Sequence, residues 1–193
     1  MIVSFIGVNG AGKSTQSKLL KDYLLSRGKS AAVVKPLDDK TKEVFGDAIK
    51  SNSLVANILL FCGFYRRQTD EIARLRAEGS IVITDRYRES FLLFHRMYGL
   101  LKMNKADLYR KLERETFGDI ESEIYVYLKI DMATANDRVG RRNRSDENFE
   151  TQETFAESVN LFEEIASLAK CVTVNGQLSE IDVHNQIRAA LKI

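Results

Sequence analysis

Two patterns of hydrophobic positions alternate along the chain and predict its elements. Short apolar runs rich in β-branched residues are typical of buried strands, and they occur at 2–6, 31–34, 81–84, 124–130 and 171–174. Between them, apolar residues recur every three or four positions, which predicts helices over about 13–28, 54–77, 88–99, 105–115, 132–142 and 151–169 and a last helix capped by Ser179. A short helix is expected within the polar stretch 38–53. This alternation predicts an α/β fold: a doubly wound five-stranded parallel sheet with helices on both faces.

Length and composition favour one domain spanning residues 1–193. Lys and Arg number 29 against 27 Asp and Glu, a net charge of +2, so the charge balance does not indicate a nucleic-acid partner. No apolar run reaches the roughly 18 residues of a membrane span, and the first strand starts too early for an N-terminal signal. Cys62 and Cys171 are expected to be reduced thiols. These features favour a cytoplasmic enzyme or switch.

The segment "GVNGAGKSTQ" follows the first strand and fits the pattern G-x-x-x-x-G-K-[ST]. Its glycines let successive backbone N–H groups turn inward around phosphate oxygens. Lys13 supplies charge to the outer phosphates, and the Ser14 hydroxyl is placed to bind Mg²⁺. A glycine-rich turn with an accidental lysine is the alternative, but the strand before the loop and the helix after it favour a nucleoside triphosphate site. The residues expected around the triphosphate are Gly7, Val8, Asn9, Gly10, Ala11, Gly12, Lys13, Ser14 and Thr15.

Asp85 and Arg86 follow the strand 81–84 directly. Ligands of doubly wound folds bind at the carboxyl ends of the strands, where Lys35 and the glycine loop are also expected. Asp85 would orient Mg²⁺ beside Ser14, and Arg86 would clamp a phosphate through two hydrogen bonds. The alternative is an acid that caps a helix, next to a surface arginine.

Two further groups of arginines suggest phosphate contacts. The segment of about 138–150 contains Arg138, Arg141, Arg142 and Arg144, which would cover the transferred phosphoryl group as a lid; a solvated basic helix end is the alternative. Arg66 and Arg67 follow "LLFCGFY" in the long helix, and they suggest an acceptor that carries its own phosphate, although solvation at the surface would also explain them.

In this order, the motifs resemble those of thymidylate kinases, which pass the γ-phosphate of ATP to dTMP. The similar segments are "GAGKSTQ" (10–16), "RRQ" (66–68), "DRYRESFLLFH" (85–95), "ANDRVGRRN" (135–143) and "LSEIDVHNQI" (178–187). Gly10 stands where some members carry a loop arginine, so the resemblance is to the branch in which lid arginines do that work.

The resemblance implies a P-loop kinase fold with an arginine lid, a homodimer, and ATP used with Mg²⁺. We interpret the reaction as direct in-line transfer between two phosphates, without a covalent enzyme intermediate. Lys13 and the loop amides would bind ATP, Ser14 and Asp85 would hold Mg²⁺, and Arg138 and Arg142 would act at the transferred group together with Lys13, Asp85 and Arg86. The residues expected at the acceptor are Lys35, Phe61 against the base, Arg66 and Arg86 on the phosphate, Tyr87 along the sugar, Ser90 and His95.

Several positions depart from the family pattern. Asn9 replaces an acid in the loop, and Lys35-Pro36-Leu37 replaces a longer Arg-Glu-Pro-Gly-Gly stretch. Phe61 and Arg66 are five residues apart where the family has four, so one of them is misassigned or the helix is bulged.

Phe91 and His95 stand where the family has a serine and a glutamine that reads the base. His95 would either hydrogen-bond a pyrimidine edge or be an ordinary surface or half-buried histidine. The alternatives to dTMP are therefore another nucleoside monophosphate or a small metabolite. A nucleotide switch is disfavoured by two arginine groups and by the lack of an Asn-Lys-x-Asp motif.

Overall fold

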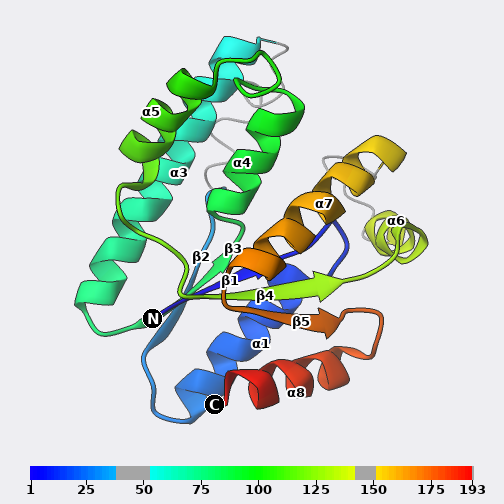
Figure 1. The fold of residues 1–193 in the computed structure, drawn as a ribbon. Helices are drawn as coiled ribbons and strands as arrows, with labels where there is room; N and C mark the ends of the chain where they lie inside the picture. Colours follow the sequence, from blue (N-terminus) through cyan, green and yellow to red (C-terminus); the bar gives the residue numbers. More distant parts are fainter. Residues whose placement is uncertain (38–52, 142–150, 193) are drawn as a thin grey trace.

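A parallel sheet of five strands forms the centre of the computed structural model, which describes residues 1–37, 53–141 and 151–192. The strands are β1 (Ile2–Ile6), β2 (Ala31–Val34), β3 (Ile81–Asp85), β4 (Ile124–Lys129) and β5 (Cys171–Asn175). Their order in the sheet is β2-β3-β1-β4-β5, and every pairing is parallel (Figure 1). The predicted α/β fold and all five predicted strands are confirmed.

The helices of the described residues also follow the predicted pattern. They are α1 (Lys13–Ser26), α3 (Leu54–Ala77), α4 (Arg88–Met97), α5 (Ala106–Phe117), α6 (Met132–Arg141), α7 (Gln152–Leu168) and α8 (Glu180–Leu191). Helix α1 ends two residues before Gly28, which has a φ of 72°, the backbone conformation that glycine adopts at helix ends. The short helix expected within 38–53 lies almost wholly outside the described residues.

Helices cover both faces of the sheet. Helices α3, α4, α5 and α7 lie on one face and α1 and α8 on the other (Figure 1). Because side chains alternate along a strand, β1 contributes Ile2 to a cluster under α3, α4 and α5, and Val3 to a cluster with Leu20 of α1 and Ile187 of α8. This two-sided burial explains why the strands are apolar runs rather than alternating ones.

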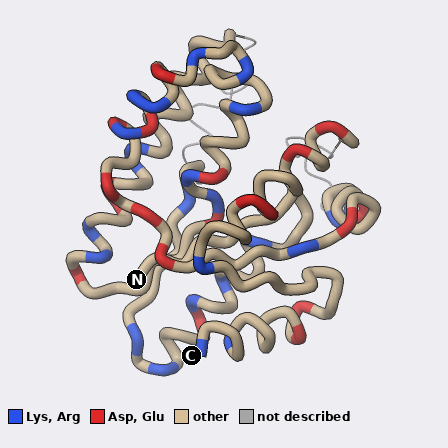
Figure 2. Tube along the Cα trace, viewed as in Figure 1, with Lys and Arg blue, Asp and Glu red and all other residues tan. Residues whose placement is uncertain are grey.

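Charged residues of both signs are interspersed along α3 and α5 (Figure 2). Pairs such as Arg74–Glu71 on α3 and Arg110–Asp107 on α5 connect neighbouring turns of the same helix. Among the described residues, no helix combines the length and the apolar character that a bilayer crossing requires.

The sheet brings three chain segments together at the carboxyl ends of its strands. The loop after β1 begins at Gly7, Lys35 follows β2, and Asp85 is the last residue of β3. β1 is the neighbour of β3, and Phe5 pairs with Asp85. The carboxyl ends of these neighbouring strands therefore lie side by side.

Candidate active site

The phosphate loop connects β1 to α1 and contains three glycines with positive φ values. Gly7, Gly10 and Gly12 have φ values of 146°, 77° and 95°, which residues with a β-carbon rarely adopt. Helix α1 begins at Lys13 without a side-chain cap and with no acid in its first turn. Its first N–H groups and its positive dipole end are therefore available to an anion.

Lys13 is held inside this loop. Its side chain is buried at 7% exposure, and its Nζ donates to the carbonyl oxygens of Gly7 and Val8, each at 2.8 Å. Two backbone carbonyl groups of the loop thus hold the Lys13 ammonium in place. The role expected for Lys13 at the outer phosphates stays a prediction.

Gly10 packs against helix α6. A β-carbon at this position would collide with the carbonyl oxygen of Ala135. The loop and α6 therefore touch through backbone, and the structure has no room for a side chain at the point where a loop arginine would stand.

Asp85 receives a hydroxyl and an ammonium at one carboxylate oxygen. Its Oδ2 accepts a hydrogen bond from Ser14 Oγ and lies 3.1 Å from Lys35 Nζ. Burial of Asp85, at 5% exposure, works to raise the pKa of its carboxyl, but Lys13, the Ser14 hydroxyl and Lys35 together hold that pKa below its ordinary value. Asp85 is a carboxylate beside a hydroxyl, a pair of hard oxygen ligands that suits Mg²⁺.

Arg86 connects the end of β3 to the phosphate loop. Its guanidinium donates to Asn9 Oδ1, and its backbone has a φ of 76°, which is uncommon for a residue with a β-carbon. The alternative role for Asp85 as a helix cap is wrong, because α4 begins at Arg88 with Tyr87 as its N-cap. Donor loop and strand end are thus joined by two side-chain contacts, Ser14–Asp85 and Asn9–Arg86.

Arg66 does not face this site, which corrects the expectation for it. Its guanidinium contacts Asp70 and the carbonyl oxygen of Glu115, and its side chain is 51% exposed. The reason is helical phase: Gln68 points to the carbonyl oxygen of Arg86 at 2.8 Å, and a residue two positions away lies roughly 200° around the helix. Arg67 instead donates to the carbonyl oxygen of Pro36 at 3.4 Å, next to Lys35.

Phe61 lies on the inner side of α3, two turns before Gln68. Its ring stacks on Phe94 of α4, with centroids 4.2 Å apart and planes at 18°. Helix α3 runs unbroken through this region, so a helical bulge does not explain the five-residue interval noted above. A base-stacking role for Phe61 stays a prediction.

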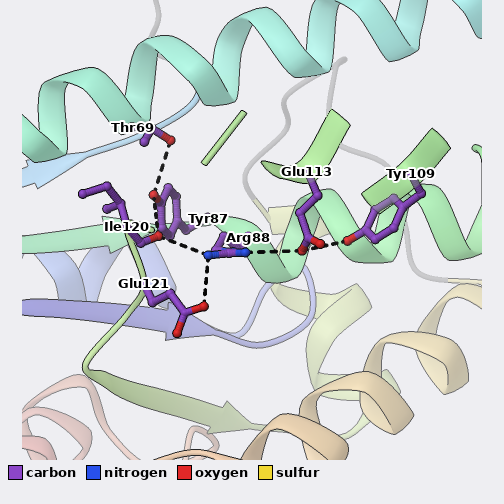
Figure 3. Close-up of polar contacts among 7 residues, drawn as sticks. All are labelled: Thr69, Tyr87, Arg88, Tyr109, Glu113, Ile120 and Glu121. Carbon is purple, nitrogen blue, oxygen red and sulfur yellow. Dashed lines mark hydrogen bonds and ion pairs between the residues drawn. The ribbon is translucent and has the colours of Figure 1, made fainter. Parts of the chain in front are cut away.

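Tyr87 lies in the core, which corrects the expected sugar contact. Its side chain is fully buried, and its hydroxyl donates to the carbonyl oxygen of Ile120 at 3.2 Å and lies 3.3 Å from Thr69 Oγ1 (Figure 3). Arg88 contacts Ile120 as well, and it pairs with Glu121 (Figure 3). Arg86 follows the end of β3 in a left-handed conformation, and at this bend the Tyr87 side chain turns into the core while Arg86 points to the loop.

His95 is also a core residue and not an exposed reader of a base. Its ring is fully buried beside Phe91, Phe94 and Tyr109, and burial lowers its pKa to about 4. Its Nδ1 accepts the N–H of Leu100 at 3.1 Å, so the ring is neutral and one nitrogen is already used. Ser90 is half-buried and hydrogen-bonded to Tyr65 of α3.

Arg138 is the expected lid residue that the structure describes near the site. Its guanidinium donates to the carbonyl oxygen of Gly176 at 2.8 Å, in the loop after β5, while Arg141 pairs with Asp137 at the surface. Arg142 and Arg144 lie outside the described residues, with the rest of the expected lid.

Gln68 and Glu89 are buried polar residues at this site to which the sequence assigned no role. Gln68 belongs to the "RRQ" segment, but its inward orientation depends on the phase of α3. An acid in the first turn of a helix, such as Glu89, usually faces solvent and stabilises the helix dipole. In the structure Glu89 is 3% exposed, and burial raises the pKa of its carboxyl to about 7.

Comparison with known proteins extends the resemblance over the chain. Residues 5–187 match the sequence model of a family described as thymidylate kinase. A thymidylate kinase of Desulfovibrio desulfuricans is 28% identical over 153 positions, covering 75% of this chain and 69% of the relative. Two others are 26% identical: a thymidylate kinase of Rickettsia canadensis, covering 98% and 96%, and a probable thymidylate kinase of Thermococcus kodakarensis, covering 100% and 97%.

Proposed function

The chain belongs to the thymidylate kinase family, and from this premise we propose that it transfers the γ-phosphate of ATP to dTMP, forming dTDP and ADP. The observation that carries the proposal is that the phosphate loop contacts the end of β3 at the carboxyl ends of the strands. Ser14 of the loop contacts Asp85, and Asn9 of the loop contacts Arg86. A donor held by Lys13 and an acceptor held by Arg86 would therefore meet end to end.

The acceptor phosphate is already an anion, so the reaction needs no strong general base. Catalysis is then positioning and charge neutralisation. Lys13 and the loop N–H groups bind the donor phosphates, and Arg86 orients the acceptor phosphate. Ser14 and Asp85 would hold Mg²⁺, which would supply positive charge against the phosphate oxygens. Lys35, which lies against Asp85, adds a cation on the acceptor side.

We assign the second acceptor-phosphate contact to Arg67 in place of Arg66. Support comes from the phase of α3, which directs Arg67 to Pro36 and Arg66 to Asp70. We also propose that residues 138–150 act as a lid, with Arg138 and Arg142 at the transferred group. The chain is proposed to form one domain over residues 1–193 and to be cytoplasmic.

A homodimer is the proposed assembly, formed through the outer face of α3. Val55 and Leu59 are 68% and 65% exposed on this face, one helical turn apart. The stripe continues into a groove lined by Cys62, Gly63 and Leu112, between α3 and α5. Leu59→Glu should shift the protein to monomer in sedimentation analysis. Leu168→Glu, at an 80% exposed site on α7, is the control that should leave the mass unchanged.

Another nucleoside monophosphate is the second candidate acceptor. It is favoured by the core positions of Phe91 and His95, which leave the base-reading residues unassigned. The test is ADP release with ATP, Mg²⁺ and a panel of monophosphates. If kcat/KM is highest with dTMP, the proposal is supported. If it is higher with another monophosphate, that monophosphate is the acceptor instead of dTMP. Nucleotide hydrolysis that no monophosphate alters would favour a switch.

A further inference from the structure

The peptide group between Arg86 and Tyr87 is held from both ends by buried side chains. Gln68 Nε2 of α3 donates to its carbonyl oxygen at 2.8 Å, and Glu89 Oε1 of α4 accepts its N–H at 2.7 Å. The two side chains come from different helices and grip the same peptide plane. A side-chain hydrogen bond at each end fixes the rotation of that plane about its axis.

This peptide sets the direction of Arg86. The residue sits in a left-handed backbone conformation, with a φ of 76°, which costs free energy for a side chain with a β-carbon. Such a conformation persists where surrounding contacts hold it. Rotation of the plane would let the backbone relax and would turn the guanidinium away from Asn9 and the phosphate loop.

The burial of two polar side chains indicates that Gln68 and Glu89 serve to hold the peptide and not merely to fill the core. Gln68 is 2% and Glu89 3% exposed, and burying an amide or a carboxyl is costly unless it is hydrogen-bonded. Among the described residues, Gln68 Oε1 and Glu89 Oε2 have no hydrogen-bond partner, so each side chain is only partly satisfied. Two leucines would avoid this cost, but they would leave the peptide unheld.

Charged groups around Glu89 reinforce the arrangement. Burial raises the pKa of its carboxyl to about 7, while the Tyr87 N–H, Arg86 and Lys13 lower it. Its charge acts on the hydroxyls of Tyr65 of α3, Tyr87 and Tyr125 of β4, where it works to raise their pKa values. The Glu89 carboxyl thus lies close to the cations Lys13 and Arg86 without being one of the proposed phosphate-binding groups.

We propose that Gln68 and Glu89 form a peptide clamp, two positioning residues that hold the Arg86–Tyr87 peptide so that Arg86 points at the acceptor's phosphate. The inference rests on the proposed function of Arg86. Gln68 Nε2 also donates to the carbonyl oxygen of Val34 at 3.3 Å, but the shorter bond is the one to Arg86. The clamp acts on acceptor binding through Arg86 and leaves donor binding at Lys13 unchanged. It adds two specificity-relevant residues to the acceptor side that do not themselves contact substrate.

The test measures dTMP and ATP kinetics for Gln68→Leu, Glu89→Leu and Glu89→Gln. Each leucine variant should raise the KM for dTMP about tenfold, the effect of one lost hydrogen bond to a fixed polar group, with an unchanged KM for ATP. Glu89→Gln keeps an oxygen that accepts the Tyr87 N–H and should restore most of the acceptor affinity. Thr69→Val is the matched control, because Thr69 is also buried on α3 but contacts the Tyr87 ring hydroxyl.

A second arm measures dTMP binding by calorimetry in an Arg86→Ala background. Positioning residues act through Arg86, so Gln68→Leu should weaken binding about tenfold in the parent protein and leave the Arg86→Ala protein unchanged. The clamp is overturned if the loss persists in that background, if Gln and Leu at position 89 act alike, or if Thr69→Val matches Gln68→Leu. Turnover of dTMP by the parent protein and its loss in Arg86→Ala test the proposed function separately.

Discussion

The donor side and the acceptor side of the site are built in different ways. On the donor side, one segment of ten residues supplies the backbone cradle, Lys13 and Ser14. On the acceptor side, Lys35, Arg67, Gln68 and Arg86 come from three segments, and their directions depend on how α3 and α4 pack on the sheet. The geometry of the donor side is specified by one local motif. The geometry of the acceptor side depends on which face of α3 each residue occupies.

This contrast predicts the largest effect on the donor side. Lys13→Ala removes the buried ammonium that bonds the Gly7 and Val8 carbonyls and that would neutralise the donor phosphates. We expect kcat to fall on the order of 10³-fold or more, with little change in the melting temperature. Steady-state turnover and a thermal melt measure both quantities. A variant with near-normal kcat would remove Lys13 from the reaction.

The second effect tests the acceptor side through the ionisation of Glu89. Its folded-state pKa, about 7, lies above its ordinary value of 4.5, so the folded protein binds the proton more tightly than the unfolded chain does. The stabilising contribution of the neutral carboxyl is therefore present below pH 4.5 and is lost as the pH rises through 7. The loss amounts to about 3 kcal/mol.

Because Gln does not titrate, Glu89→Gln isolates this contribution. The difference in unfolding free energy, parent minus variant, should fall by about 3 kcal/mol between pH 4.5 and pH 8. His95 works in the opposite direction, since its pKa of about 4 makes stability fall as the pH drops below 6.5. Both proteins contain His95, so it cancels in the difference, which urea titrations measure. A difference that stays constant with pH would mean that Glu89 is ionised as in water.

The third effect concerns the contact between the loop and α6. Gly10→Ala places a β-carbon against the Ala135 carbonyl oxygen, in addition to the strain of a positive φ. Gly28→Ala is the matched control, because Gly28 has a similar φ of 72° but nothing within 4 Å. Gly10→Ala should lose about 2 kcal/mol more than the control, measured by urea denaturation. Equal losses would show that α6 does not press on the loop.

The sequence predicted the strands and most helix ends well because their signals are local. Apolar runs, Gly28 and the Ser179 cap of the last helix depend on neighbours within a few positions. The loop residues were predicted for the same reason. Arg66, Tyr87 and His95 were misplaced because their environments depend on tertiary packing: a helix phase fixed by Gln68, a backbone reversal at Arg86, and an aromatic cluster between α4 and α5.

The smallest expected effect compares two adjacent arginines and tests the helical phase itself. Arg67→Ala should raise the KM for dTMP about tenfold, because one charge-assisted phosphate contact is lost, with the KM for ATP unchanged. Arg66→Ala removes a surface pair with Asp70, which contributes little in solvent, so its kinetics should stay within about twofold of the parent. Arg66 and Arg67 are the same residue type on the same helix, and they differ only in the side of α3 from which they project. Reversed effects would mean that α3 is rotated in the working enzyme, and the acceptor contact would return to Arg66.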